Sequence, residues 1–280
     1  MNGSSSTNRF IPMSTVSSGT GVECAPDIYC FTIQFVNVCF VGDSTKGDNW
    51  VLIDAGTPKS AQKIIEEAKD RFGKSAKPKA IILTHAHFDH IGAILELIEE
   101  WDVPIYAHDL ELPYLTGKKN YPLPDSSVDS GLIAKISPMF PTEAIDLGNH
   151  VKPLPSDGVI PHMEGWRWIH TPGHTEGHIS LFRDADRALI VGDAFVTVKQ
   201  ESLYSVITQE LEIHGPPRYL TTDWGSAWES VRVLEKLKPL VAVTGHGHPA
   251  TGEWLSENLS ILARDFDQIA IPSKGKYVNK

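Results

Sequence analysis

The stretch LTHAHFDHIG, residues 83–92, places His85, His87, Asp89 and His90 directly after the apolar run KAIIL. A core histidine normally needs one hydrogen-bond partner and an apolar wall, so three histidines interleaved with a carboxylate need another explanation. Imidazole nitrogens and carboxylate oxygens are the ligands by which proteins hold zinc and related metals. The stretch therefore predicts a metal site at the end of a strand.

Further ligand-type residues follow three other strand-like runs. His174 comes after WRWIH, Asp193 after ALIVG and His246 after VAVTG. A sheet whose strands end at one edge brings such residues together from distant parts of the sequence. The chain is therefore predicted to build one site from the ends of four strands.

The number of candidate ligands indicates two metal ions. A tetrahedral zinc ion takes about four donors, which is fewer than the motifs offer. Two ions about 3.5–4 Å apart need a bridging ligand, and Asp193 is the predicted bridge because it is the only candidate after its strand. The full predicted set is His85, His87, Asp89, His90, His174, Asp193 and His246.

The segments between these motifs alternate between strand-like and helix-like patterns, which predicts an α/β fold. Residues 28–54 have the composition of antiparallel strands, with breaks at Asn37, at Gly42 and Asp43, and over residues 46–49. Apolar residues at helical spacing predict a helix over residues 58–72. Ser226 and Glu229 have the spacing of a capping box at the start of a later helix.

Length and composition favour one large domain. With 280 residues, of which 41% are hydrophobic, the chain can bury a sizeable core. We expect a flexible lead-in over residues 1–20 and a single domain over residues 21–280. Within it, residues 109–165 are rich in Pro, Ser and Asp and predict an inserted loop region that shapes substrate entry.

Charge and hydropathy limit the classes of partner. The formal charge of −10, without a basic run, argues against nucleic acid. No apolar run approaches the ~18 residues of a membrane span, and the polar N-terminus lacks the apolar segment of a secretory signal. We expect a cytoplasmic protein whose partner is a small-molecule substrate, in an oligomeric state left open. Three cysteines are expected to be ordinary core thiols: Cys24, Cys30 and Cys39.

The order THAHFDH, TPGHTEGH, GD and TGHG resembles the metallo-β-lactamase fold hydrolases over roughly residues 28–270. The resemblance implies a four-layer αββα sandwich with the site at one edge of its two sheets. It implies two divalent ions, with zinc expected and iron or manganese as alternatives. In the implied arrangement Asp193 binds both ions, a first ion is bound by His85, His87 and His174, and a second by Asp89, His90 and His246.

The implied metals predict the reaction. Two dications around a shared water lower its pKa towards neutrality, which gives a bridging hydroxide nucleophile without a side-chain base. Asp89 and Asp193 are the predicted catalytic residues, and Asp89 is placed to orient the nucleophile or move its proton. We therefore expect a metal-dependent hydrolase of the esterase or lactonase kind, acting on a carboxylic ester or lactone, with thioesters and lactams left open.

Two other classes share the scaffold and remain alternatives. Iron-dependent redox enzymes of this fold include persulfide dioxygenases and flavodiiron reductases, although this chain has no flavodoxin segment. A phosphodiesterase would share the metals but would need a cationic substrate groove, which the sequence does not indicate.

Residues around the ligands have predicted supporting roles. Asp54 ends a strand level with the ligands and is expected to accept a hydrogen bond from a ligating imidazole. His178 matches the second histidine of the family's GHTxGH pattern and is expected to support the ligands. An apolar substrate pocket is predicted from Phe88, Phe195, Tyr204, His214, Tyr219 and Trp224.

Overall fold

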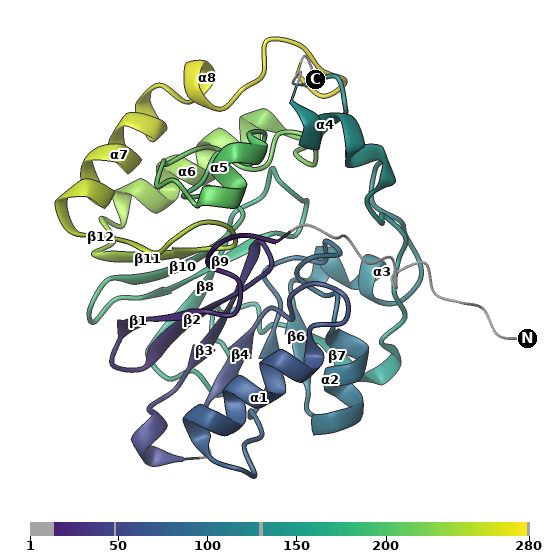
Figure 1. Ribbon diagram of the computed structural model, residues 1–280, viewed down its shortest axis with the longest axis vertical. Helices are drawn as coiled ribbons and strands as arrows, with labels where there is room; N and C mark the ends of the chain where they lie inside the picture. The colour runs from purple at the N-terminus through teal and green to yellow at the C-terminus, as the bar shows by residue number, and fades with distance from the viewer. Residues whose placement is uncertain (1–13, 48, 129–130, 279–280) are drawn as a thin grey trace, which may run out of the picture. The chain divides into compact units, whose positions relative to one another are not determined.

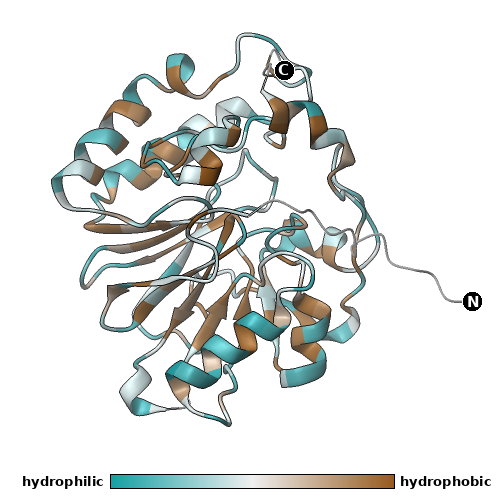
Figure 2. Cartoon of the chain, in the orientation of Figure 1, coloured by the Kyte–Doolittle hydropathy of each residue, from teal (hydrophilic) through white to brown (hydrophobic). Residues whose placement is uncertain are grey.

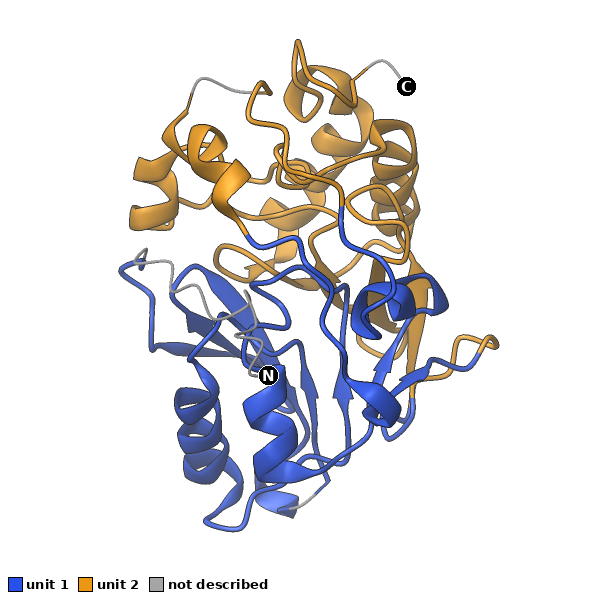
Figure 3. Cartoon of the chain, turned by 90° about the vertical axis from the view of Figure 1, so that its right-hand side faces the viewer, with its two compact units in different colours: residues 1–121, 141–155, 161–164 blue, residues 122–140, 156–160, 165–280 orange. Residues whose placement is uncertain are grey.

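The chain forms two units in a computed structural model that describes residues 14–47, 49–128 and 131–278 (Figure 1). Unit 1 comprises residues 1–121, 141–155 and 161–164, and unit 2 comprises the remaining residues, 122–140, 156–160 and 165–280 (Figure 3). Residues 1–13 of the expected lead-in lie outside the described residues. The single domain over residues 21–280 stays a prediction.

Unit 1 contains a seven-stranded sheet in the order β1-β2-β3-β4-β5-β6-β7. The strands β1 to β4 pair antiparallel, whereas β4 to β7 pair parallel. Because β4 to β7 are parallel, their carboxyl ends lie at one edge of this sheet. The strand bounds are β1 Gly21–Ala25, β2 Ile28–Ile33, β3 Val36–Val41, β4 Val51–Ile53, β5 Ile81–Ile82, β6 Ile105–Ala107 and β7 Val151–Pro153.

Helices α1 (Ala61–Phe72) and α2 (Ile94–Trp101) pack against this sheet. The short helix α3 (Leu112–Leu115) follows β6 along the chain. Hydrophobic residues dominate the strands, whereas α1 carries both hydrophobic and hydrophilic residues around its axis (Figure 2). The ring of Trp50 stacks on that of Phe72 with centroids 4.6 Å apart. The helix predicted over residues 58–72 is confirmed from residue 61 onward.

The predicted break between the first strands is placed differently in the structure. The chain turns at Gln34, which has a positive φ of 57°, and Asn37 lies within β3. Asn37 is buried there, and its side-chain oxygen accepts a 2.8 Å hydrogen bond from the Thr32 hydroxyl. A polar residue that finds a partner across the hairpin therefore continues the strand instead of ending it.

Unit 2 contains a five-stranded sheet in the order β12-β11-β10-β9-β8. β10 runs parallel to β11 and antiparallel to β9, which is itself antiparallel to β8. The strands β8, β10 and β11 therefore point the same way, and their carboxyl ends share one edge of this sheet. The bounds are β8 Trp166–His170, β9 Ile179–Arg183, β10 Ala188–Gly192, β11 Val241–Thr244 and β12 Ala250–Thr251.

The helices of unit 2 include α6 and α7, whose apolar faces pack in one core with β10 and β11. Their bounds are α4 Leu132–Ile136, α5 Leu203–Thr208, α6 Trp224–Lys236, α7 Gly252–Arg264 and α8 Phe266–Ile269. The predicted capping box of α6 is wrong. Asp223 is the N-cap, and its carboxylate accepts hydrogen bonds from the backbone N–H and the hydroxyl of Ser226, at 2.9 and 2.7 Å.

The expected loop region over residues 109–165 contains regular structure. It includes α3, α4 and the strand β7, which pairs in parallel with β6. In the described part of the chain, no helix has the length and apolar character needed to cross a membrane.

Candidate metal centre

Unit 1 presents four candidate ligands in the loop that follows β5. His85, His87, Asp89 and His90 are all buried. The rings of His85 and His87 meet edge to face with centroids 4.8 Å apart, and those of His85 and His90 lie 4.2 Å apart. The loop therefore gathers three imidazoles and one carboxylate within unit 1.

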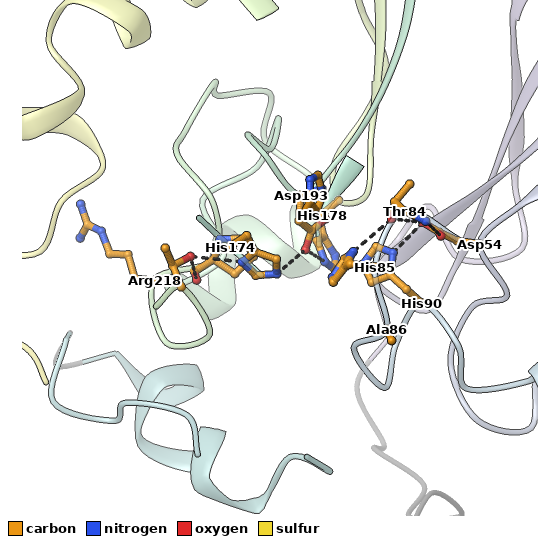
Figure 4. A network of polar contacts seen from close by, with 12 residues as sticks. Asp54, Thr84, His85, Ala86, His90, His174, His178, Asp193 and Arg218 are labelled. Carbon is orange, nitrogen blue, oxygen red and sulfur yellow. Dashed lines mark hydrogen bonds and ion pairs between the residues drawn. The ribbon is translucent and has the colours of Figure 1, made fainter. Parts of the chain in front are cut away.

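Hydrogen bonds to Asp54 and Thr84 fix two of these rings (Figure 4). Asp54 Oδ2 lies 2.8 Å from His90 Nδ1 and accepts a 2.8 Å bond from the Thr84 hydroxyl. Because that hydroxyl donates to Asp54, it accepts from the Nδ1 of His85, 3.0 Å away. Both histidines then donate from Nδ1, so that in the neutral form the lone pair of each Nε2 is left for a metal. The contact expected of Asp54 is present, whereas Thr84 was missed.

We expect Asp54→Asn to lower metal affinity or activity by about 10–100-fold, the usual effect of losing such a supporting contact. Asp54 accepts hydrogen bonds on both carboxylate oxygens, and an amide offers only one acceptor. Asp54 has a positive φ of 61°, which asparagine tolerates, so the change adds no backbone strain. Metal titration of the apoprotein checks this, with Asp70→Asn on the exposed face of α1 as control. Equal affinities in both variants would contradict it.

Unit 2 presents three buried candidate ligands at the carboxyl edge of its sheet. His174 follows β8, Asp193 follows β10 and His246 follows β11, as the strand directions require. The Nε2 atoms of His174 and His246 lie 3.5 and 3.1 Å from the same carboxylate oxygen, Oδ2 of Asp193. Two imidazoles from different strands therefore converge on one oxygen within unit 2.

A contact with Thr221 fixes which ring nitrogen of His174 faces Asp193. Thr221 donates its hydroxyl hydrogen to the carbonyl of Pro217 at 2.8 Å. It therefore accepts from Nδ1 of His174, 3.1 Å away. Its Nε2 then faces Oδ2 of Asp193, and a neutral imidazole and a carboxylate in this arrangement can share a cation as ligands. Thr221 was missed in the sequence.

His178 supports Asp193 through the backbone. Its Nε2 accepts a 2.8 Å hydrogen bond from the N–H of Asp193, and its Nδ1 lies 2.8 Å from the Thr171 hydroxyl. Because Nε2 is used by a peptide N–H, His178 positions the peptide that carries Asp193. This contact fits the supporting role expected of it.

The predicted pocket residues have different surroundings. Phe195 and Trp224 belong to the buried core of unit 2, which favours a packing role for both. Tyr219 packs edge to face on Phe140, with ring centroids 5.7 Å apart. Tyr204 on α5 is 71% exposed.

The remaining two pocket candidates, Phe88 and His214, are buried. Phe88 lies between the ligands of the unit 1 loop. The backbone of His214 pairs with Val196, three residues beyond Asp193, through hydrogen bonds of 2.9 and 3.0 Å. Burial lowers the pKa of His214, which favours the neutral ring. Contact of these residues with substrate stays a prediction.

Comparison with known proteins identifies the family. The profile described as "Metallo-beta-lactamase superfamily" matches residues 31–246. The "Probable metallo-hydrolase YflN" of Bacillus subtilis (strain 168) is 50% identical over 260 residues, which cover 93% of this chain and 98% of the relative.

Solved structures agree with this match. TTHA1623, solved in a di-iron-bound form, is 25% identical with a TM-score of 0.52, covering 82% of this chain and 92% of the other. BLEG-1 B3 metallo-β-lactamase is 22% identical with a TM-score of 0.54, covering 85% of this chain and 97% of the other. The expected α/β fold of the metallo-β-lactamase type is therefore confirmed. The chain belongs to the metallo-β-lactamase superfamily.

Proposed function

We propose that this chain is a hydrolase that uses two divalent metal ions to cleave a carboxylic ester or lactone. Membership of the superfamily and the 50% identical relative named as a probable metallo-hydrolase support metal-dependent hydrolysis. The observation that carries the proposal furthest is the convergence of two imidazole Nε2 atoms on one oxygen of Asp193.

The proposal assigns the seven ligands as the family resemblance does. One ion would be held by His85, His87 and His174, the other by Asp89, His90 and His246, and both by Asp193. When bound, such a pair of dications makes a water molecule nucleophilic near neutral pH and neutralises charge that develops on the substrate. The carboxylate of Asp89 would orient the nucleophile or move its proton. Asp54, Thr84 and Thr221 hold the rings of His90, His85 and His174 by Nδ1, which would leave Nε2 of each ring for a metal.

An uncharged acyl substrate fits the chain better than a phosphodiester. The formal charge of −10 disfavours the approach of a polyanion. Arg218 donates its guanidinium hydrogens to the carbonyls of Ile269 and Ala270 at 2.7 and 2.8 Å. Its charge is therefore committed to the fold of unit 2. The proposed partner is a small-molecule substrate, with no nucleic acid and no membrane.

Iron-dependent redox chemistry is the second candidate, and one observation favours it. TTHA1623 was solved with two irons bound and is 25% identical to this chain. The same His and Asp donors accept zinc, iron or manganese. Metal content therefore separates the two functions more directly than the fold does.

The test is a substrate panel run beside metal analysis of the purified protein. We expect kcat/KM on p-nitrophenyl esters or lactones to exceed that on a thioester, nitrocefin and bis-p-nitrophenyl phosphate. Higher turnover of the phosphodiester than of every ester and lactone would overturn the substrate class. Iron as the main metal, with no hydrolysis of any member of the panel, would favour the redox candidate.

A further inference from the structure

Ala86 lies between two candidate ligands, and its backbone N–H is held from outside the loop. This N–H donates to Oε2 of Glu111 at 3.0 Å and to the hydroxyl oxygen of Tyr121 at 3.1 Å. The Tyr121 hydroxyl in turn donates to the same Glu111 oxygen. These two residues, here called the Glu111–Tyr121 clamp, come from positions 25 and 35 residues further along the chain.

The carboxylate of Glu111 is unusual because its residue is 0% exposed. A buried carboxyl group is costly unless donors satisfy it, and the donors to Glu111 include one peptide N–H and one phenol. The buried N–H of Ala86 in turn would be costly to leave without its acceptors. This contact restrains the short segment that joins His85 to His87.

The ring of Tyr121 is itself fixed on two sides. It stacks on Tyr114 with centroids 3.9 Å apart and rings nearly parallel, and it lies 4.5 Å from the ring of His87. Its backbone N–H donates to the carbonyl of Thr142 at 2.9 Å. Tyr121 thus limits the movement of both the Ala86 peptide and the His87 ring.

We infer that Glu111 and Tyr121 are positioning residues that set the direction in which His85 and His87 present their nitrogens to a metal. The inference rests on the proposed metal-binding role of these two histidines. Successive ligands separated by one residue depend on the rotation of the intervening peptide, because a turn of that peptide moves both rings together. The clamp holds this peptide by its only hydrogen-bond donor.

The experiment measures Zn²⁺ affinity of the apoprotein by competition with a chromophoric chelator. We expect Glu111→Ala to weaken the binding of one ion by about 10–100-fold, as loss of a contact outside the ligands usually does. Glu111→Gln keeps an acceptor oxygen and is expected to recover part of that loss. Tyr121→Phe keeps the ring on His87 but removes one partner of the Ala86 N–H, so its loss should be smaller than that of Glu111→Ala.

Matched controls are Glu99→Ala, which is exposed on α2, and Tyr106→Phe in β6. Circular dichroism and thermal unfolding show whether each apoprotein folds. If Glu111→Ala does not fold, the comparison of Glu111→Gln and Tyr121→Phe with the wild type provides the test. A folded Glu111→Ala with wild-type Zn²⁺ affinity would overturn the inference. Equal losses in Glu111→Ala and Glu111→Gln would also overturn it, because charge alone would then explain them. Failure of the wild type to bind Zn²⁺ would instead refute the proposed function.

Discussion

Asp193→Asn is expected to lower kcat/KM by roughly 10³-fold and to weaken the binding of at least one metal ion. Asp193 Oδ2 is the atom on which the Nε2 atoms of His174 and His246 converge. An amide carries no charge, and metal sites supply several kcal/mol of charge stabilisation, with about 1.36 kcal/mol for each tenfold in rate. Kinetics on the best substrate of the panel and metal content by mass spectrometry check this result.

Asp184→Asn is the matched control for that change. Asp184 also lies in unit 2 and is exposed, with an ion pair to Arg167 at 3.0 Å. Surface pairs of this kind contribute about 0–1 kcal/mol, so activity and metal content should be unchanged. Wild-type stoichiometry and rate in Asp193→Asn would refute the bridging role.

Removal of the metals is expected to abolish hydrolysis and to lower the thermal stability of the chain. A ligand that binds only the folded state stabilises it by about 4 kcal/mol at a thousand times its Kd. For a protein of this size, this corresponds to a fall in Tm of roughly 8–16 °C.

Scanning calorimetry before and after dialysis against a chelator gives the measurement. Activity and Tm should return together when Zn²⁺ is added back in twofold molar amount. Calcium at the same concentration serves as the control, because it prefers oxygen ligands in larger number. Full activity in chelated protein with no residual metal would refute a metal-dependent reaction.

The ligand candidates could be predicted from sequence because each depends on local information. A short buried strand such as β5 or β10 is visible as an apolar run, and the residue after it lies at the sheet edge whatever the rest of the chain does. The directions of β8, β10 and β11 then place His174, Asp193 and His246 at one edge. Family resemblance added the layer architecture, which strand patterns alone do not specify.

Other parts of the site depend on contacts between distant residues and were missed for that reason. Thr221 and His174 are 47 positions apart, and Glu111 and Ala86 are 25 apart. Nothing in the residues beside Thr221 or Glu111 marks them. Thr84 differs, since a threonine directly before a ligand at a strand end is a local signal that could have been used.

The two local errors have a different cause, because each depends on which short-range hydrogen bond forms. Asn37 usually breaks a strand because its side chain competes for the backbone, yet in β3 that side chain bonds Thr32 across the hairpin. At α6, both Asp223 and Ser226 are good N-cap residues. Asp223 is the N-cap, and its carboxylate satisfies the Ser226 N–H.

The order of the two sheets along the chain has a consequence for biosynthesis. The last strand of the unit 1 sheet ends at Pro153, before the unit 2 sheet begins at Trp166. At about 5–20 residues per second, a ribosome needs roughly 6–23 s to add the residues from 165 to 280. During that interval the sheet that carries His85 to His90 can form while His246 has yet to be translated. Metal ions can therefore bind the complete set of proposed ligands only after the ribosome has synthesised β11 and His246.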